Sequence, residues 1–308
     1  LDSPLFCIGT YKNFILISEG GGGKDYGLPN VVKVYRREFP VKEPIFELDF
    51  DTKLMSHFQF AYKGLNYMVA AVSKTVGIFQ IDDKTGELKE IKRIDADFHE
   101  KSPEVAKVRW TQDNKYFISG GEDGYARLFK VNYGDDGVIQ GFEQEQELGA
   151  HHEAINDVSI NADNSMIVSS STDKTCRIYT LKDGKCVKKL SFSEGVGMEN
   201  LQFKGAVFSP DSRFLYTLAT KFKGRSYLIK WDAKDENFSP IDTTTAHNGP
   251  SWALEISKNG NYAAVGTNDG HIVGINTNSM STYRSEKKHK MPVSSIIFSE
   301  DDSSILST

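Results

Sequence analysis

The segment VAKVRWTQDNKYFISGGEDGYARLFKV, residues 105–131, contains three short runs of alternating apolar residues separated by two polar turns. Val, Ile, Phe and Tyr are frequent in these runs, which is typical of β-strands. The same order of strands and turns recurs in INDVSINADNSMIVSSSTDKTCRIYTL at 155–181 and in SWALEISKNGNYAAVGTNDGHIVGINT at 251–277. A looser copy occupies residues 201–233. The chain is therefore built from a repeated three-strand unit.

The spacing of these repeats indicates the architecture. The first-turn residues Asp113, Asp163, Asp211 and Asn259 are separated by 50, 48 and 48 residues, slightly more than the usual length of a four-stranded propeller blade. A more polar run, such as LKEIKRI (88–94) or CVKKLSF (186–192), follows a three-strand core and is a candidate outer strand. No convincing amphipathic run of twelve residues separates the strands, so βαβ units are not expected.

The repeats predict an all-β fold, a single seven-bladed β-propeller of degenerate repeats with four-stranded antiparallel blades. One domain covers residues 1–308, and division of 308 residues by seven gives 44 residues per blade, a usual blade length. We expect closure to protect the sheet edges, with a terminal strand completing the last blade. The predicted blades are 5–50, 54–95, 104–149, 154–192, 201–245, 251–286 and 292–308 plus a terminal strand.

The composition of the chain argues against several classes of function. The net charge of −5 and the pI near 5.9 argue against a nucleic-acid partner, which normally requires a basic stripe. The basic run RSEKKHK at 284–290 is interpreted as a solvated strand and turn. The three cysteines, Cys7, Cys176 and Cys186, lack zinc-ligand spacing and are expected to be reduced thiols. No run is long enough to span a membrane, and a first residue other than Met indicates a piece of a longer polypeptide.

Two motifs resemble the WD-repeat family in degraded form. They are KWDA at 230–233 and GAHHEAINDVSI at 149–160, with Asp173 and Arg177 in the turn DKTCR. We expect His151 and His152 to form structural hydrogen bonds with a turn aspartate rather than to bind metal or transfer protons. No Ser/His/Asp motif, nucleophile elbow or metal-ligand cluster is evident, so an enzyme is not expected.

The first predicted blade contains an insertion. The strands FILIS (14–18) and VVKVYR (31–36) are joined by a stretch that includes GGGGKDYGLPN, residues 20–30, whereas the equivalent hairpins elsewhere are as short as GTNDG. Long loops in compact repeats are disproportionately functional. The glycines match neither a P-loop nor a dinucleotide-binding pattern. A flexible glycine-rich tip is the plain alternative.

Glycines have no Cβ, so several of their carbonyl oxygens can turn to one point, an arrangement that suits potassium. We therefore expect backbone carbonyls of the glycine run to bind a weakly hydrated cation such as K⁺. The bound ion would hold the stiff end of the loop, Leu28, Pro29 and Asn30, in a fixed pose.

This loop resembles the potassium-binding loop of the endoplasmic-reticulum exchange factors for the Sar-type small GTPase of COPII coat assembly, the prolactin regulatory element-binding protein family. That family has Ile where this chain has Leu28. The resemblance implies guanine-nucleotide exchange without covalent chemistry, and contact with the GTPase through Leu28, Pro29 and Asn30. It further implies that the K⁺ ion is bound by the backbone carbonyls of Gly20, Gly21, Gly22, Gly23 and Gly27. It also implies an endoplasmic-reticulum location, with this domain on the cytosolic face and a transmembrane anchor outside residues 1–308.

A second hairpin carries basic residues. TKFKGRS at 220–226 contains Lys221, Lys223 and Arg225, which would steer an acidic partner surface from the same propeller face as the glycine loop. A solvated basic turn is the alternative interpretation. For the whole chain, the alternative function is a non-catalytic WD-repeat scaffold for endoplasmic-reticulum export or other protein complexes.

Overall fold

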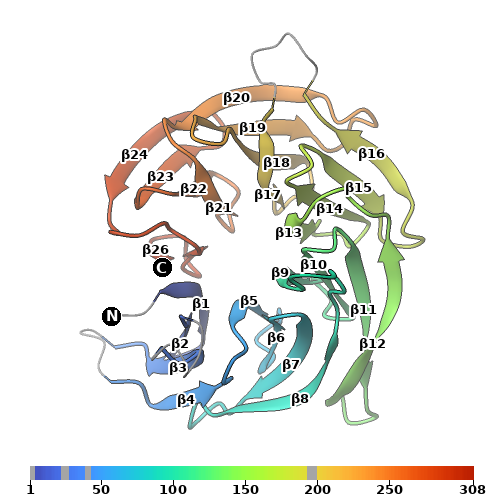
Figure 1. Cartoon of the computed structure of the whole chain (residues 1–308), viewed down its shortest axis with the longest axis vertical. Helices are drawn as coiled ribbons and strands as arrows, with labels where there is room; N and C mark the ends of the chain where they lie inside the picture. Colours follow the sequence, from blue (N-terminus) through green and yellow to red (C-terminus); the bar gives the residue numbers. More distant parts are fainter. Residues whose placement is uncertain (1–3, 22–27, 39–42, 193–199) are drawn as a thin grey trace. The chain divides into compact units, whose positions relative to one another are not determined.

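The computed structural model describes residues 4–21, 28–38, 43–192 and 200–308. Within these ranges the strands form six four-stranded sheets and one two-stranded sheet, and no helix is present (Figure 1). The described residues accordingly contain no helix able to cross a membrane. The chain divides into two compact units, Leu1–Asp123 with Arg127–Glu147 and Gly124–Ala126 with Leu148–Thr308. The single domain expected from the sequence stays a prediction.

Three four-stranded sheets, here called blades and numbered in chain order, belong to the first unit. The first blade consists of β1 (Leu5–Tyr11), β2 (Phe14–Glu19), β3 (Val31–Arg36) and β4 (Phe46–Asp49). The second consists of β5 (Met55–Phe60), β6 (Tyr67–Val72), β7 (Thr75–Ile81) and β8 (Leu88–Asp95). The third consists of β9 (Val105–Trp110), β10 (Tyr116–Gly121), β11 (Ala126–Tyr133) and β12 (Ile139–Leu148).

The second unit contains three more blades and the two-stranded sheet. The fourth blade consists of β13 (Ile155–Ile160), β14 (Met166–Ser171), β15 (Cys176–Thr180) and β16 (Cys186–Leu190). The fifth consists of β17 (Gln202–Phe208), β18 (Phe214–Thr220), β19 (Ser226–Asp232) and β20 (Pro240–His247). The sixth consists of β21 (Ser251–Ile256), β22 (Tyr262–Thr267), β23 (His271–Asn276) and β24 (Ser281–Lys287). Strands β25 (Ile296–Phe298) and β26 (Ile305–Ser307) pair with each other.

The predicted number of seven blades is wrong, because the described chain forms six four-stranded blades. The residues expected to form the seventh blade, 292–308, contribute only β25 and β26. The error came from counting the C-terminal residues 292–308 as a blade, and the 44 residues per blade obtained by dividing 308 by seven only agreed with that count. The measured repeat of 48 to 50 residues leaves room in 308 residues for six blades and a short remainder. The extra length per repeat includes long outer strands, such as the ten-residue β12.

Burial follows the period-two pattern of the strands. In β6 all six residues are buried: Met68, Ala70 and Val72 pack into the core shared with the first blade, and Val69 and Ala71 pack into the core shared with the third. A strand that is buried on both faces has a continuous apolar sequence. The outer strand β24, in contrast, is exposed along most of its length. Stacking of neighbouring blades therefore forms the cores within each unit.

The repeated first turns are fixed by local hydrogen bonds. In each, a side-chain oxygen accepts a hydrogen bond of 2.8 to 3.2 Å from the backbone N–H two residues later. The acceptors are Asp113, Asp163, Asp211, Asn259 and Asp301. The next residue has a positive φ in every case: Asn114, Asn164, Ser212, Gly260 and Asp302. These Asx turns explain why the turn residues mark the repeat so clearly.

Candidate functional site

The glycine-rich insertion lies between β2 and β3, as the sequence predicts. It comprises residues 20–30, whereas the corresponding connections in the other five blades contain two to five residues, the extremes lying between Val72 and Thr75 and between Thr220 and Ser226. Gly22, Gly23 and Gly27, three of the predicted potassium ligands, lie outside the described residues. Gly20 and Gly21, with the three residues at the other end, form the described base of the loop.

Asn30 fastens the end of this loop to the connection between β4 and β5. Its side chain is buried, with 2% of the residue exposed, and Nδ2 donates a hydrogen bond to the Asp51 carbonyl at 2.9 Å. The Asn30 carbonyl accepts a bond of 2.8 Å from the Phe50 N–H. The other amide atom, Oδ1, is buried and has no hydrogen-bond partner among the described residues. Asn30 is therefore held by two hydrogen bonds, and its Oδ1 is an acceptor without a partner in the described chain.

The two described glycines are in close contact with the far end of the loop. A Cβ on Gly20 would lie 2.2 Å from Asn30 Oδ1, and one on Gly21 would lie 2.5 Å from Leu28 Cδ1. Any side chain would therefore displace these residues. Leu28 is half-buried and Pro29 is exposed, so the described tip offers Pro29 and part of Leu28 to a partner. Direct contact by Asn30 stays a prediction, because its amide would first have to leave Asp51.

An ion pair lies at the base of the loop. Glu19, at the end of β2, is buried and forms an ion pair with Lys33 of β3. The hydrogen bond with Glu19 raises the pKa of the Lys33 ammonium. Ser18 is also buried, and its Oγ has no hydrogen-bond partner among the described residues. The base of the loop thus carries more oxygen acceptors than the described donors satisfy.

The basic hairpin joins β18 and β19 in the second unit. Lys221, Lys223 and Arg225 are exposed, and none has a salt-bridge partner within the part of the chain that the structure describes. The Lys221 N–H donates to the Arg225 carbonyl at 3.0 Å, which closes the turn. Its expected position on the same face as the glycine loop stays a prediction, because the two hairpins belong to different units.

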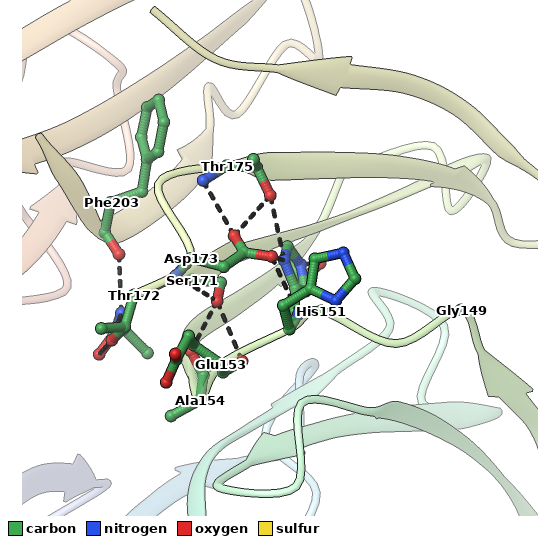
Figure 2. A network of polar contacts seen from close by, with 12 residues as sticks. Gly149, His151, Glu153, Ala154, Ser171, Thr172, Asp173, Thr175 and Phe203 are labelled. Carbon is green, nitrogen blue, oxygen red and sulfur yellow. Dashed lines mark hydrogen bonds and ion pairs between the residues drawn. The ribbon is translucent and has the colours of Figure 1, made fainter. Parts of the chain in front are cut away.

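The prediction for His151 is confirmed. Its Nδ1 lies 2.9 Å from Asp173 Oδ2 and its Nε2 lies 2.7 Å from Ser169 Oγ. Thr175 Oγ1 donates to the other carboxylate oxygen at 2.6 Å, so that the Asp173 carboxylate lies between His151 and Thr175 (Figure 2). The His151 side chain is fully buried and that of Asp173 is 4% exposed. The network is therefore structural rather than open to a substrate.

Electrostatics support the same conclusion. Burial lowers the pKa of His151 and outweighs the hydrogen bond that Asp173 accepts from it, so the imidazole is neutral at pH 7. Burial raises the pKa of Asp173, but hydrogen bonds from His151 and Thr175 outweigh it and hold the pKa well below its usual range. His152 contributes through its backbone N–H, which donates to Asp173 at 3.1 Å. The ionised carboxylate satisfies several donors that would otherwise be buried without partners.

The model of the family "WD domain, G-beta repeat" matches residues 92–130, 142–180 and 238–273. Each match starts within or just before an outer strand and runs into the third strand of the next blade, as 142–180 does from β12 to β15. The chain therefore contains WD repeats. The His151 network is the hydrogen-bonded feature that its Gly-His-like motif predicts.

The chain is similar to several proteins that carry different names. Pre-mRNA-processing factor 19 homolog 2 of Arabidopsis thaliana is 27% identical over 55% of this chain and 29% of its own length. THO complex subunit 3 of the same plant is 24% identical over 63% of this chain and 70% of its own length. Actin-interacting protein 1 of Drosophila melanogaster is 25% identical over 57% of this chain and 26% of its own length. The matches thus span less than a third of the first and third relatives.

The structure brings together one polar group that the sequence patterns did not indicate. His247, Asp269 and His271 place their potential ligand atoms within 4.8 Å of one another, so they form a candidate metal-ligand group. The signal was present in the repeat: Asp269 follows His247 by 22 residues, as Asp173 follows His151. The sixth-blade copy is harder to identify from the sequence because Thr245 stands where the fourth-blade motif has Gly149.

Proposed function

We propose that this WD-repeat protein is a guanine-nucleotide exchange factor for a Sar-type small GTPase. The observation that supports the proposal is the insertion 20–30 between β2 and β3, which ends in Leu28, Pro29 and the anchored Asn30. None of the other five blades has a long connection at this position. A partner-binding loop on a rigid blade is a common way for repeat proteins to gain a specific function.

We propose that a potassium ion binds the loop, and the described residues at its base are compatible with one. The fit rests on Asn30 Oδ1, a buried oxygen without a hydrogen-bond partner in the described chain, beside Gly20. The Asn30 amide oxygen and the Gly20 and Gly21 carbonyls would hold the ion, together with Gly22, Gly23 and Gly27. Bound K⁺ would supply positive charge that draws these oxygens together. No organic cofactor is proposed.

Exchange requires no covalent step. A protein that binds the nucleotide-free GTPase more tightly than the GDP-bound form accelerates GDP release through that difference in affinity. In the proposed complex, Pro29 and Leu28 form the contact surface, and Pro29 reduces the entropy lost on docking. Asn30 holds the tip through Asp51 and contacts the GTPase once its amide is released. Lys221, Lys223 and Arg225 attract the partner over a longer range.

The location follows from the same proposal. An exchange factor for a Sar-type GTPase would act at the cytosolic face of the endoplasmic-reticulum membrane, where COPII coats assemble. A membrane anchor outside residues 1–308 would keep it there. Neither nucleic acid nor direct membrane contact by residues 1–308 belongs to the proposal.

GDP release from a Sar-type GTPase of the same organism tests the proposal. Release of a fluorescent GDP analogue is followed in potassium and in sodium buffer, with wild type and with Asn30→Ala. We expect wild type to accelerate release at least tenfold in potassium, with a smaller effect in sodium. Asn30→Ala is expected to lose most of the acceleration, since it removes the side-chain bond to Asp51.

Asn66→Ala is the matched control. Asn66 Nδ2 donates to the Ile81 carbonyl at 3.1 Å in the second blade, so this variant also loses an amide–carbonyl bond but leaves the loop intact. Urea unfolding of both variants establishes that they are folded in the assay. If wild type leaves the GDP release rate unchanged in potassium, the exchange proposal fails.

A non-catalytic scaffold is the second candidate, and the names of relatives such as THO complex subunit 3 favour it. A scaffold binds its partner without any preference for the nucleotide-free state. Equal affinity for the GDP-bound and nucleotide-free GTPase, or no binding to either, would therefore favour the scaffold over the exchange factor.

A further inference from the structure

The fourth and sixth blades carry the same polar arrangement with one chemical difference. In the fourth blade, His151 is followed by Asp173 after 22 residues and by Thr175 after 24. In the sixth-blade copy, His247 is followed by Asp269 and His271 at the same two separations. A second imidazole thus replaces the threonine hydroxyl. Two histidines and one carboxylate are a common set of protein ligands for transition metals.

The three side chains converge. His271 Nδ1 lies 2.9 Å from Asp269 Oδ1, and His247 Nε2 lies 3.2 Å from the same carboxylate. The two imidazole rings have centroids 5.2 Å apart and an interplanar angle of 36°. All three potential ligand atoms lie within 4.8 Å of one another. Tetrahedral zinc has ligand bonds of about 2 Å. The three ligand atoms are already so close together that small movements of the side chains would bring both nitrogens and the carboxylate within bonding distance of one ion.

Hydrogen bonds involving Thr267 hold the Asp269 carboxylate in place. Thr267 Oγ1 donates a hydrogen bond of 2.6 Å to Asp269 Oδ1, and the His271 backbone N–H donates to Thr267 Oγ1 at 2.8 Å. Support of this kind, which orients a ligating side chain, is characteristic of protein metal sites. Burial raises the pKa of Asp269, but hydrogen bonds from Thr267 and His271 outweigh it and keep the pKa below its usual range. The carboxylate is therefore ionised at pH 7.

Accessibility separates this group from the fourth-blade network. The side chains of His247, Asp269 and His271 are 17%, 50% and 27% exposed, whereas those of His151 and Asp173 are 0% and 4% exposed. In the fourth blade both imidazole nitrogens are occupied, by Asp173 and Ser169. The sixth-blade group is open to solvent, which allows an ion to enter and a water molecule to complete the coordination.

Nearby positive charge opposes cation binding only weakly. Lys287 pairs with His271 across β23 and β24, and Lys288 lies close in sequence. Lys288 Nζ forms an ion pair with Glu286 at 2.6 Å, and both residues lie at the surface. Exposed charges of this kind are screened by water and salt. The direct bonds from two imidazoles and a carboxylate act at much shorter range.

We infer that His247, Asp269 and His271 form a binding site for a divalent transition-metal ion of the zinc class. His247 lies at the end of β20, Asp269 lies in the turn after β22, and His271 begins β23 (Figure 1). The ion ties the outer strand of the fifth blade to a hairpin of the sixth, both within the second unit. With three protein ligands and an open fourth position, it stabilises the two blades and remains accessible to small ligands.

Calorimetric titration with Zn²⁺ tests the inference, after treatment of the protein with a chelator and its removal. Wild type is expected to bind one Zn²⁺ per chain at this site. His271→Thr restores the arrangement of the fourth blade, so we expect it to fold and to bind Zn²⁺ at least tenfold more weakly. Titration with Co²⁺ gives a second readout, because absorption bands in the visible range report the coordination geometry directly.

His152→Asn is the matched control. Asn248 stands at the equivalent position of the sixth blade, and the variant removes an exposed histidine that is not part of the site. It should bind Zn²⁺ as wild type does. Absence of saturable Zn²⁺ binding by wild type, or equal affinity in wild type and His271→Thr, would overturn the inference, since in the second case another site holds the ion.

Discussion

Removal of the Asp173 carboxylate is expected to destabilise the second unit strongly. This side chain accepts hydrogen bonds from His151, Thr175 and two backbone N–H groups. In Asp173→Ala the His151 Nδ1–H can turn to Thr175 Oγ1, 3.2 Å away, but the Thr175 hydroxyl and the Thr175 backbone N–H lose their acceptor. Each buried donor left unpaired costs about 1–3 kcal/mol. The loss of two such bonds to a charged group therefore predicts a decrease of about 3–5 kcal/mol in the free energy of unfolding.

Asp269→Ala provides the comparison at the equivalent position of the sixth blade. The Asp269 side chain is 50% exposed, so water replaces much of what is lost, and we expect a cost of about 1 kcal/mol. Both variants and wild type are unfolded with urea at pH 7 and followed by tryptophan fluorescence. A chelator is present so that bound metal does not contribute. Equal costs for the two variants would refute the argument from burial.

Two further predictions concern His151 and the core of the third blade. Burial lowers the pKa of His151, so as the pH falls the imidazole is protonated in the unfolded chain before it is protonated in the folded protein. The free energy of unfolding should therefore decrease between pH 7 and pH 5, by at most about 1.4 kcal/mol per pH unit. His151→Gln should reduce that pH dependence in urea titrations. Phe117 is fully buried against Trp110, Phe129 and Phe142, so Phe117→Ala should lower stability by about 3–5 kcal/mol. Phe98→Ala, at a residue that is 62% exposed, should cost less than about 1 kcal/mol; similar melting temperatures for these two variants would contradict the packing argument.

The sequence determined the strands, their order and the turns between them, because these depend on neighbouring residues. The continuous apolar run of β6 is buried between two cores, and an Asp or Asn two residues before an N–H donor fixes the first turns of the third to sixth blades. The insertion at 20–30 was also predictable, since it interrupts a repeat of known order. The pairing of His151 with Asp173 followed from a family motif rather than from local chemistry.

Tertiary structure decided what depends on residues far apart in the chain. The number of blades could not be obtained by dividing the length, because the loops and outer strands vary from blade to blade. Burial of Asn30 depends on the Asp51 carbonyl, 21 residues away, and no local pattern specifies that contact. Likewise, His247 approaches His271 only because the end of β20 lies beside the turn between β22 and β23. Local preferences fix the pieces of this chain, whereas the stacking of blades brings their polar side chains together.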